Sequence, residues 1–320
     1  MAPVNEGPII EAKGLTKRYG PTIAVDRLDL TVEAGEVFGL LGPNGSGKTT
    51  TILMVMGLTD VTAGQVRVRD LDPARAPLAV KRAIGYMPDS VGFYDDLTAR
   101  QNLRYTGRLA GLRGQELEQR IVAALDKVTL TGVADRRLAA FSHGMRQRLG
   151  LADALLKQPS LVILDEPTNR MDPHATQKFL ALIQVLKRDG ITVLLSSHLL
   201  DRVQAVCDRV ALFHRGRIAL LGSVTELALE VLGTGHRILV EADGIRLEAA
   251  LRGIAGVHSV HREEETRFEL EAESDLRPEV AAAIAGAGGR LFSLGIRQPS
   301  LEEVYNRYFE RAKEEVPDAA

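Results

Sequence analysis

Cysteine is nearly absent from the sequence, and this scarcity limits the compartments and the chemistry open to the protein. The 320 residues contain one cysteine, Cys207, so no disulfide can form within the chain, which suits a reducing cytosol. The thiol lies in a stretch, residues 200–210, whose pattern predicts a helix. We therefore expect Cys207 to be a small core residue, the alternative being a reactive thiol.

Excess charge and long apolar runs are lacking as well. Lys and Arg total 40 against 42 Asp and Glu, a formal net charge of −2, so no nucleic acid is expected as a partner. Apolar runs such as residues 193–195 are far shorter than the roughly 18 residues of a membrane-spanning helix. The first ten residues include Pro3, Glu6 and Pro8 and lack a basic start followed by an apolar run, so no signal peptide is expected. Any membrane role would therefore come through a partner protein.

The first two thirds of the chain alternates short β-rich runs with helical patterns. Residues 161–164 and 192–196 are continuous apolar runs, which indicates strands buried on both faces of a parallel sheet. The helical pattern at 173–187 lies between them and completes a βαβ crossover. Thr98 and Gln101 have the spacing of a capping box. Further strands are expected at residues 9–14, 24–32, 36–41, 65–69 and 83–87, the first two in an antiparallel edge region. Helices are expected at 48–57 and from 97 to 157.

A second unit begins near Gly222 and has the order β-α-β-β-α-β, which is typical of the ferredoxin-like arrangement. A last helix follows, with Ser300 as its cap and Glu303 completing a capping box. Its apolar stripe over residues 301–309 predicts core packing, with a partner-binding face as the alternative. Glu263-Glu264-Glu265 is expected at a solvated hairpin tip. The strands are expected at 237–241, 257–262, 267–271 and 291–296, and the helices at 246–254 and 278–284.

The strongest motif is a glycine-rich loop that fits the pattern G-x-x-x-x-G-K-[ST] between a strand and a helix. Glycines let successive backbone N–H groups converge on phosphate oxygens, and the helix N-terminus adds partial positive charge. Lys48 is expected to reach the β- and γ-phosphates, and the Thr49 hydroxyl to bind Mg²⁺. The residues expected to bind the nucleotide here are Gly42, Pro43, Asn44, Gly45, Ser46, Gly47, Lys48, Thr49 and Thr50.

The second motif is an acidic pair, Asp165 and Glu166, that directly follows the apolar run 161–164. Carboxylates at the carboxyl end of a buried strand lie where open α/β sheets bind ligands. Asp165 is expected to hold Mg²⁺, and Glu166 to polarise the attacking water. Alone, such a pair equally suits a surface turn, but downstream of a P-loop it predicts a nucleoside-triphosphatase.

With these motifs the sequence resembles the ABC ATPases over residues 8–222. Phe141-Ser142-His143-Gly144-Met145-Arg146-Gln147-Arg148-Leu149 is similar to the family's signature motif and precedes the acidic strand at the usual distance. The resemblance makes His198 the switch histidine, Asp172 the D-loop aspartate and Tyr19 the aromatic residue that stacks on adenine. It implies an α/β P-loop core with a helical subdomain at about 90–157, followed by the ferredoxin-like domain at 223–320.

The resemblance also implies a homodimer that holds ATP between two protomers. Ser142 and the Gly144 backbone of one protomer would donate to the γ-phosphate bound by the P-loop of the other. Glu166, His198 and Lys48 would form the catalytic set, acting by positioning and charge stabilisation.

Four residues depart from the commonest family pattern. Asp89 stands where glutamine is usual, and its carboxylate can still face Mg²⁺ and the nucleotide. His143 and Met145 replace a glycine and a glutamine of the signature, and Arg170 replaces a small residue of the D-loop, which puts that contact across the dimer in question. The other catalytic positions are intact, so hydrolysis is expected.

The final segment, residues 298–305, resembles the ATP-binding subunits of type-2 ABC exporters, including the daunorubicin-resistance type. Such subunits sit on the cytosolic face of the membrane and pair with a separately encoded permease of about six spans. Residues 89–97, with Phe93 and Tyr94, lie where the family receives the permease. Two alternatives stay open: a soluble ABC ATPase of the translation-factor or DNA-repair class, and a nucleotide-sensing regulator with little turnover.

Overall fold

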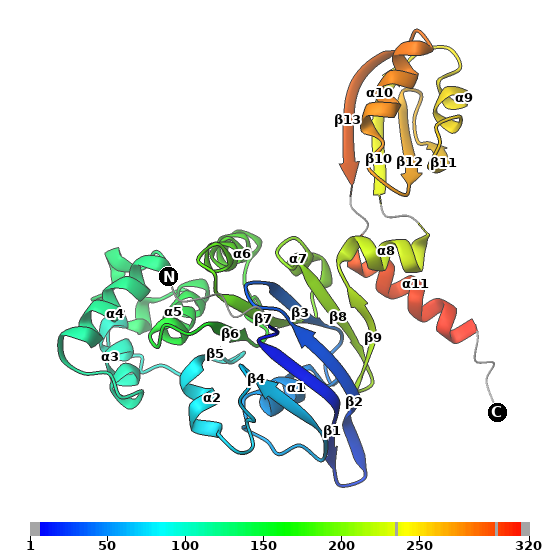
Figure 1. Ribbon diagram of the computed structural model, residues 1–320. Coiled ribbons are helices and arrows are strands. Elements are labelled where there is room, and N and C mark those ends of the chain that lie inside the picture. Colours follow the sequence, from blue (N-terminus) through cyan, green and yellow to red (C-terminus); the bar gives the residue numbers. More distant parts are fainter. Residues whose placement is uncertain (1–6, 234–235, 298–299, 315–320) are drawn as a thin grey trace. The chain divides into compact units, whose positions relative to one another are not determined.

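The computed structural model describes residues 7–233, 236–297 and 300–314, and it divides into two compact units, Met1–Leu221 and Gly222–Ala320 (Figure 1). The sequence-based domains, 8–222 and 223–320, remain a prediction. Gln298 and Pro299, which open the exporter-like segment, lie outside the described residues.

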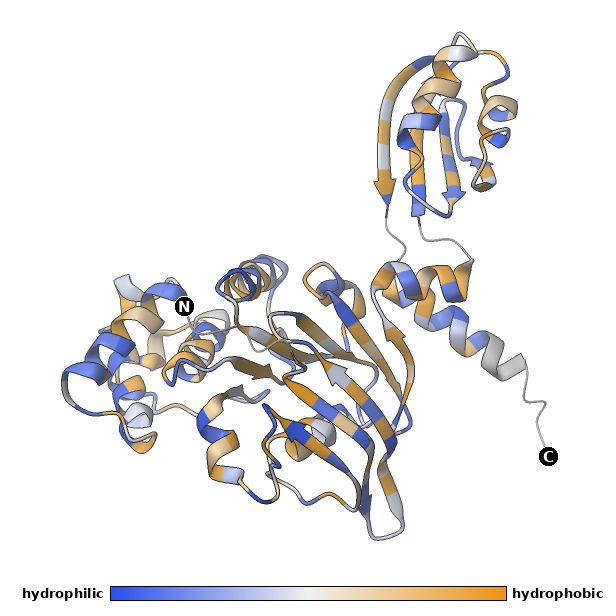
Figure 2. Ribbon diagram, in the orientation of Figure 1, coloured by the Kyte–Doolittle hydropathy of each residue, from blue (hydrophilic) through white to orange (hydrophobic). Residues whose placement is uncertain are grey.

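A six-stranded sheet organises the first unit. Its order is β5 (Ile84–Met87), β6 (Leu161–Leu164), β7 (Thr192–Ser197), β3 (Val37–Leu41), β8 (Arg209–His214) and β9 (Arg217–Gly222). The strands from β5 to β8 pair in parallel, so their carboxyl ends share one edge. Every residue of β3, β6 and β7 is buried, and β6 is hydrophobic throughout (Figure 2). The predicted central parallel strands are confirmed.

A smaller antiparallel sheet packs against this core. Its order is β2 (Thr22–Val32), β1 (Ile10–Tyr19) and β4 (Ala63–Val68), which confirms the predicted antiparallel region. The prediction ended the first strand at Gly14, whereas β1 continues through a bulge where Gly14 takes φ 57°. The apolar residues of this sheet, of α1 (Lys48–Val55) and of β3 form one buried core.

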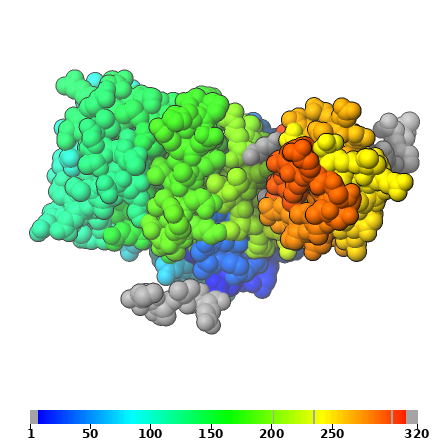
Figure 3. All heavy atoms as spheres, turned by 90° about the horizontal axis from the view of Figure 1, so that it is seen from above, coloured from blue at the N-terminus to red at the C-terminus, as the bar shows by residue number. Residues whose placement is uncertain are grey.

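Helices complete the first unit. They are α2 (Pro77–Ala83), α3 (Ala99–Leu109), α4 (Gly114–Lys127), α5 (His143–Leu155), α6 (Pro173–Arg188) and α7 (Leu200–Gln204). The predicted capping box of α3 is present, since Gln101 N–H donates to Thr98 Oγ1 (3.2 Å) and Thr98 N–H to Gln101 Oε1 (2.8 Å). In Figure 3, α3 and α4 (teal) form a lobe at one end of the unit, beside α6 (green). Two short 3₁₀ turns, Thr131–Val133 and Leu138–Ala140, lead into α5.

The helix predicted at residues 200–210 is wrong beyond its first turn. Asp208 N–H donates to Val37 O (2.9 Å), and Val37 N–H donates to Asp208 Oδ2 (2.9 Å), so pairing with β3 overrides the helical pattern. Cys207 therefore lies between α7 and β8, with its sulfur 3.0 Å from where a Cβ at Gly39 would sit. Burial raises the pKa of the Cys207 thiol, which suits a packing role.

The second unit has the predicted ferredoxin-like order. Its elements are α8 (Val224–Leu232), β10 (His236–Asp243), α9 (Leu247–Arg252), β11 (Val257–Arg262), β12 (Arg267–Ala272), α10 (Arg277–Gly286), β13 (Arg290–Arg297) and α11 (Leu301–Glu314). The sheet order is β11-β12-β10-β13 and all pairings are antiparallel. The cap of α11 is confirmed, because Glu303 N–H donates to Ser300 Oγ at 3.1 Å. Within the described ranges, none of the helices is both long and apolar enough to cross a bilayer.

Candidate functional site

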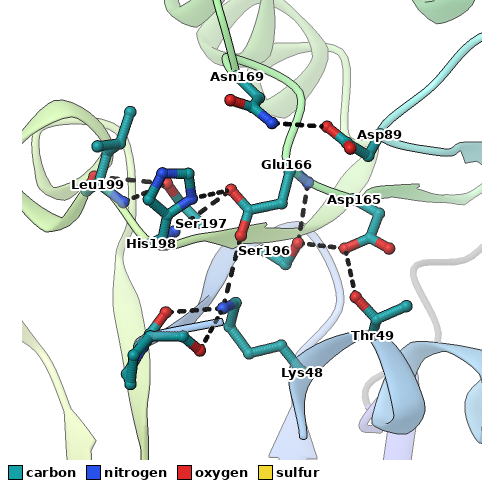
Figure 4. Close-up of polar contacts among 12 residues, drawn as sticks. Lys48, Thr49, Asp89, Asp165, Glu166, Asn169, Ser196, Ser197, His198 and Leu199 are labelled. Carbon is teal, nitrogen blue, oxygen red and sulfur yellow. Dashed lines mark hydrogen bonds and ion pairs between the residues drawn. The ribbon is translucent and has the colours of Figure 1, made fainter. Parts of the chain in front are cut away.

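The candidate site lies where β3, β6 and β7 end side by side. A cavity of about 350 Å³ opens at this edge of the sheet. Its walls come from the loop after β3, the acidic pair after β6 and His198 after β7, three segments far apart in sequence (Figure 4). The lining residues are Ala24, Asn44, Gly45, Gly47, Lys48, Thr49, Thr50, Asp89, Asp165, Glu166, Asn169 and His198.

The glycine-rich loop has a backbone that only glycine can follow at two points. Gly42 has φ 144°, and a Cβ there would lie 2.4 Å from Phe213 O. Gly47 has φ 108° and begins α1, and a Cβ there would lie 2.7 Å from Ala24 O. Side chains at either point would push the loop off the sheet. The loop therefore curls tightly onto the N-terminus of α1, as an anion-binding loop must.

Lys48 crosses the mouth of this loop. Its Nζ donates to Gly42 O (2.7 Å) and Pro43 O (3.1 Å), and lies 3.5 Å from Glu166 Oε1. Burial lowers the pKa of Lys48, and the Glu166 carboxylate opposes that shift. The ammonium is thus held between the loop and the acidic pair.

The two acids point to different partners (Figure 4). Asp165 Oδ1 accepts from Ser196 Oγ (2.5 Å) and Thr49 Oγ1 (3.2 Å). Burial raises the pKa of Asp165, while the hydrogen bonds from Ser196 and Thr49 lower it. Glu166 has φ 48°, in the left-handed region, and its Oε2 lies 2.8 Å from His198 Nδ1. One carboxylate therefore faces the Thr49 hydroxyl and the other faces Lys48 and His198.

Sequence reasoning missed Ser196, which joins the two acids. Its hydroxyl donates to Asp165 and accepts from the backbone N–H of Glu166 at 2.9 Å. It is fully buried on β7. The pairing of β6 with β7 brings it there, so nothing near it in the sequence reveals the contact.

We expect Ser196→Ala to raise the Mg²⁺ concentration needed for half-maximal ATP hydrolysis by about 10- to 100-fold, because it removes the hydroxyl that orients Asp165. Titrating Mg²⁺ at fixed ATP measures this shift. Ser197→Ala is the matched control, since Ser197 is equally buried but accepts from Leu199 N–H (3.0 Å). An unchanged Mg²⁺ requirement in Ser196→Ala would remove Ser196 from the site.

Asn169 is the second residue that the sequence did not reveal. Its side-chain amide donates to Asp89 Oδ1 at 3.1 Å, and both residues line the cavity. Asp89 lies in the loop after β5. Burial and the carboxylates of Asp165 and Asp89 raise the pKa of Tyr86 to about 12, which reflects the negative field on this side of the cavity.

The residues present fit a nucleotide with Mg²⁺. Over the described residues, no group of three or more His, Cys, Asp or Glu side chains is arranged to hold a metal ion by itself. Mg²⁺ is usually held by one or two carboxylates together with substrate phosphates, and Asp165, Asp89 and the Thr49 hydroxyl supply such hard oxygen donors. In addition, the buried Ser46 Oγ of the loop has no hydrogen-bond partner among the described residues, a polar atom suited to a ligand.

Besides Gly42, Pro43 and Ser46 of the glycine-rich loop, four predicted site residues are not among those that line the cavity. Tyr19 is 48% exposed, with Lys17 Nζ 4.8 Å from its ring centre. Ser142 caps α5 by accepting from Met145 N–H (3.3 Å), and Asp172 caps α6 by accepting from Ala175 N–H (2.8 Å). These contacts give Ser142 and Asp172 structural roles within one protomer. Gly144 lies in the first turn of α5. Their nucleotide contacts stay predictions.

A parallel sheet with this loop after β3 and this acidic pair after β6 defines the P-loop nucleoside triphosphatases. The family model described as ABC transporter matches residues 25–169. A linearmycin resistance ATP-binding protein of Bacillus subtilis (strain 168) is 33% identical over 93% of this chain and 97% of that protein. A daunorubicin resistance ATP-binding protein of Streptomyces coeruleorubidus is 34% identical over 94% and 95%, respectively. The chain belongs to the ATP-binding proteins of the ABC transporter family.

Solved structures share the fold. An ATP-binding subunit of an ABC transporter superposes with a TM-score of 0.62 at 30% identity, covering 69% of this chain and 92% of that one. The dimeric structure of a bacterial ABC transporter cassette gives 0.59 at 25% identity, covering 67% and 98%. The predicted ABC ATPase core is confirmed, and membership of the family implies ATP binding and ATP hydrolysis linked to transport.

Proposed function

We propose that this chain is the ATP-hydrolysing subunit of an exporter and acts at the cytosolic face of the membrane through a separate permease. The observation that carries the proposal is that two groups of polar residues in mutual contact lie at the edge of the sheet. Lys48, Glu166 and His198 form one group, and Thr49, Asp165 and Ser196 form the other. The nearly full-length similarity to two antibiotic-resistance ATP-binding proteins supports export.

The two groups divide the work of phosphoryl transfer. Lys48 and the loop N–H groups bind and orient the phosphates, while Thr49, Asp165 and Asp89 provide oxygen donors for the metal. Mg²⁺, when bound, neutralises charge that develops on the phosphate oxygens. Glu166 accepts a hydrogen bond from the attacking water and polarises it toward the γ-phosphate. His198 holds the Glu166 carboxylate, because its Nδ1 carries the proton in their hydrogen bond.

We infer that two copies act together. The N-terminal end of α5, residues 142–144 and here called the signature tip, faces in one protomer the P-loop of the other. Ser142 and the first N–H groups of α5 supply donors and a positive helix end for a γ-phosphate. The dimeric state of a related cassette supports this arrangement. ATP would stabilise the closed dimer, and its hydrolysis would release it.

The permease contact is proposed on the segment before α3. Tyr94 is 54% exposed and packs edge-to-face on Tyr105, with ring centres 5.3 Å apart. The backbone of Tyr94 is held at both ends by the buried Asn102, which accepts from Tyr94 N–H (2.9 Å) and donates to Tyr94 O (3.1 Å). A buried amide thus fixes an exposed aromatic residue in place, which suits an interface anchor.

Replacing Phe93 and Tyr94 with alanine is expected to lower transport by at least about 10-fold while ATP hydrolysis by the isolated subunit stays at its normal rate, because interface anchors contribute binding energy. Transport and phosphate release in proteoliposomes with the cognate permease measure the two effects. Phe292→Ala is the matched control, since Phe292 is as exposed as Tyr94, at 54%. Normal transport by the double variant would exclude this segment as the contact.

A further inference from the structure

The signature helix is tied to the nucleotide cavity of its own protomer by two hydrogen bonds in series. His143 Nε2 lies 2.9 Å from Asn169 O, and the Asn169 side-chain amide donates to Asp89 Oδ1 at 3.1 Å. The three residues come from the tip of α5, the loop after β6 and the loop after β5. Asp89 and Asn169 line the cavity, whereas His143 lies outside it. Two residues that depart from the family pattern are thereby joined through a third.

The rest of the tip also lies against the end of the loop after β6 and the first turn of α6. A Cβ at Gly144 would be 3.1 Å from Ala175 Cβ in α6 and 3.6 Å from Met171 Cε in the loop, so α5 approaches both closely. Asn169 N–H donates to Glu166 O (3.1 Å), which makes residues 166–169 a compact turn. A displacement of Asp89 or Glu166 would therefore shift the carbonyl that His143 contacts.

The chemistry of the His143 contact fixes which variants can replace it. A carbonyl oxygen accepts, so Nε2 must carry a proton, and it does so both in one neutral tautomer and in the imidazolium. Glutamine can place an N–H in the same region, whereas alanine and glycine offer no donor. The second link needs an amide at 169, because a carboxylate there would face the Asp89 carboxylate.

We propose that His143 is a positioning residue. Through it, the nucleotide site of each protomer sets the position of the signature tip that the same protomer presents to its partner. This rests on the proposed two-protomer arrangement, in which that tip completes the opposite site. Binding at one site moves Asp89 and Asn169, and His143 passes the displacement to α5. The two sites of the dimer are thereby coupled, so that ATP hydrolysis depends cooperatively on ATP concentration.

The test is the Hill coefficient of ATP hydrolysis by the full-length protein. The wild type is expected to exceed 1, and His143→Ala to fall to about 1, because the coupling between sites is lost. His143→Gln is expected to keep the wild-type value, and Asn169→Asp to match His143→Ala, since it breaks the other link. Combining His143→Ala with Asn169→Asp should lower the coefficient no further than either change alone.

Two further readouts separate positioning from other causes. The affinity of His143→Ala for a fluorescent ATP analogue should equal that of the wild type, measured at protein concentrations low enough to keep both monomeric. The melting temperature should be unchanged as well. A wild-type coefficient of 1, or an undiminished coefficient in His143→Ala, would overturn the coupling. Absence of ATP hydrolysis in the wild type, or of an ATP-dependent dimer in Glu166→Gln, would instead overturn the proposed function.

Discussion

Replacing Lys48 with alanine is expected to weaken Mg-ATP binding by at least about 30-fold, because it truncates a buried, charge-paired group. Three contacts would be lost together, to Gly42 O, to Pro43 O and to the Glu166 carboxylate. The side chain of Glu166 is only 13% exposed, so it would keep a buried charge without this partner. The negative phosphates would then meet an uncompensated carboxylate as well as lose a cation. Isothermal titration with Mg-ATP measures the loss.

Lys157 provides a control of the same chemistry elsewhere in the unit. Its Nζ also donates to two backbone carbonyls, Lys81 O and Ile84 O, at 2.5 Å each, and burial lowers its pKa as it does for Lys48. Lys157→Ala should therefore lower the melting temperature while leaving the Kd for Mg-ATP unchanged. Full affinity in Lys48→Ala would refute the proposed phosphate cradle.

Lys48 and its loop were predictable from the sequence because their geometry is local. The spacing of Gly42, Gly47 and Lys48 fixes a turn and a helix start within eight residues, and the structure needs glycine at both glycine positions. The strands β6 and β7 were also predictable from the sequence, since a strand buried on both faces shows a nearly continuous run of apolar residues. Local signals therefore gave the loop, the central strands and the acidic pair.

What the sequence did not reveal depends on contacts between distant segments. Ser196 meets Asp165 because β7 pairs with β6, and Asn169 meets Asp89 because β5 pairs with β6. A serine at a strand end and an asparagine in a turn have ordinary local explanations, so neither stood out. A contact between distant segments also explains why the helix predicted at residues 200–210 was wrong, since pairing with β3 ended that helix. Strands β8 and β9 were likewise not predicted.

Replacing Glu166 with glutamine is expected to slow ATP hydrolysis by at least about 100-fold while ATP binding persists, because the change removes a general base and preserves the shape of the side chain. Glutamine can still accept through Oε1 from His198 Nδ1, which lies 2.8 Å from the present carboxylate. It cannot accept a proton from water, and it no longer offers Lys48 a negative partner. With ATP bound and not consumed, two protomers should stay joined, so light scattering should show a dimer only when Mg-ATP is present.

Glu36→Gln is the matched control for this change. Glu36 is another half-buried glutamate, its pKa is raised by burial, and it pairs with Arg209 at 3.3 Å, outside the nucleotide cavity. Its amide variant should hydrolyse ATP at the wild-type rate and form no stable dimer. If Glu166→Gln and the wild type released phosphate at the same low rate, the chain would be a nucleotide sensor with little turnover. If both released it rapidly, another group would have to activate the water. Only a large difference in rate between Glu166→Gln and the wild type is compatible with Glu166 polarising the water while His198 holds the Glu166 carboxylate in place.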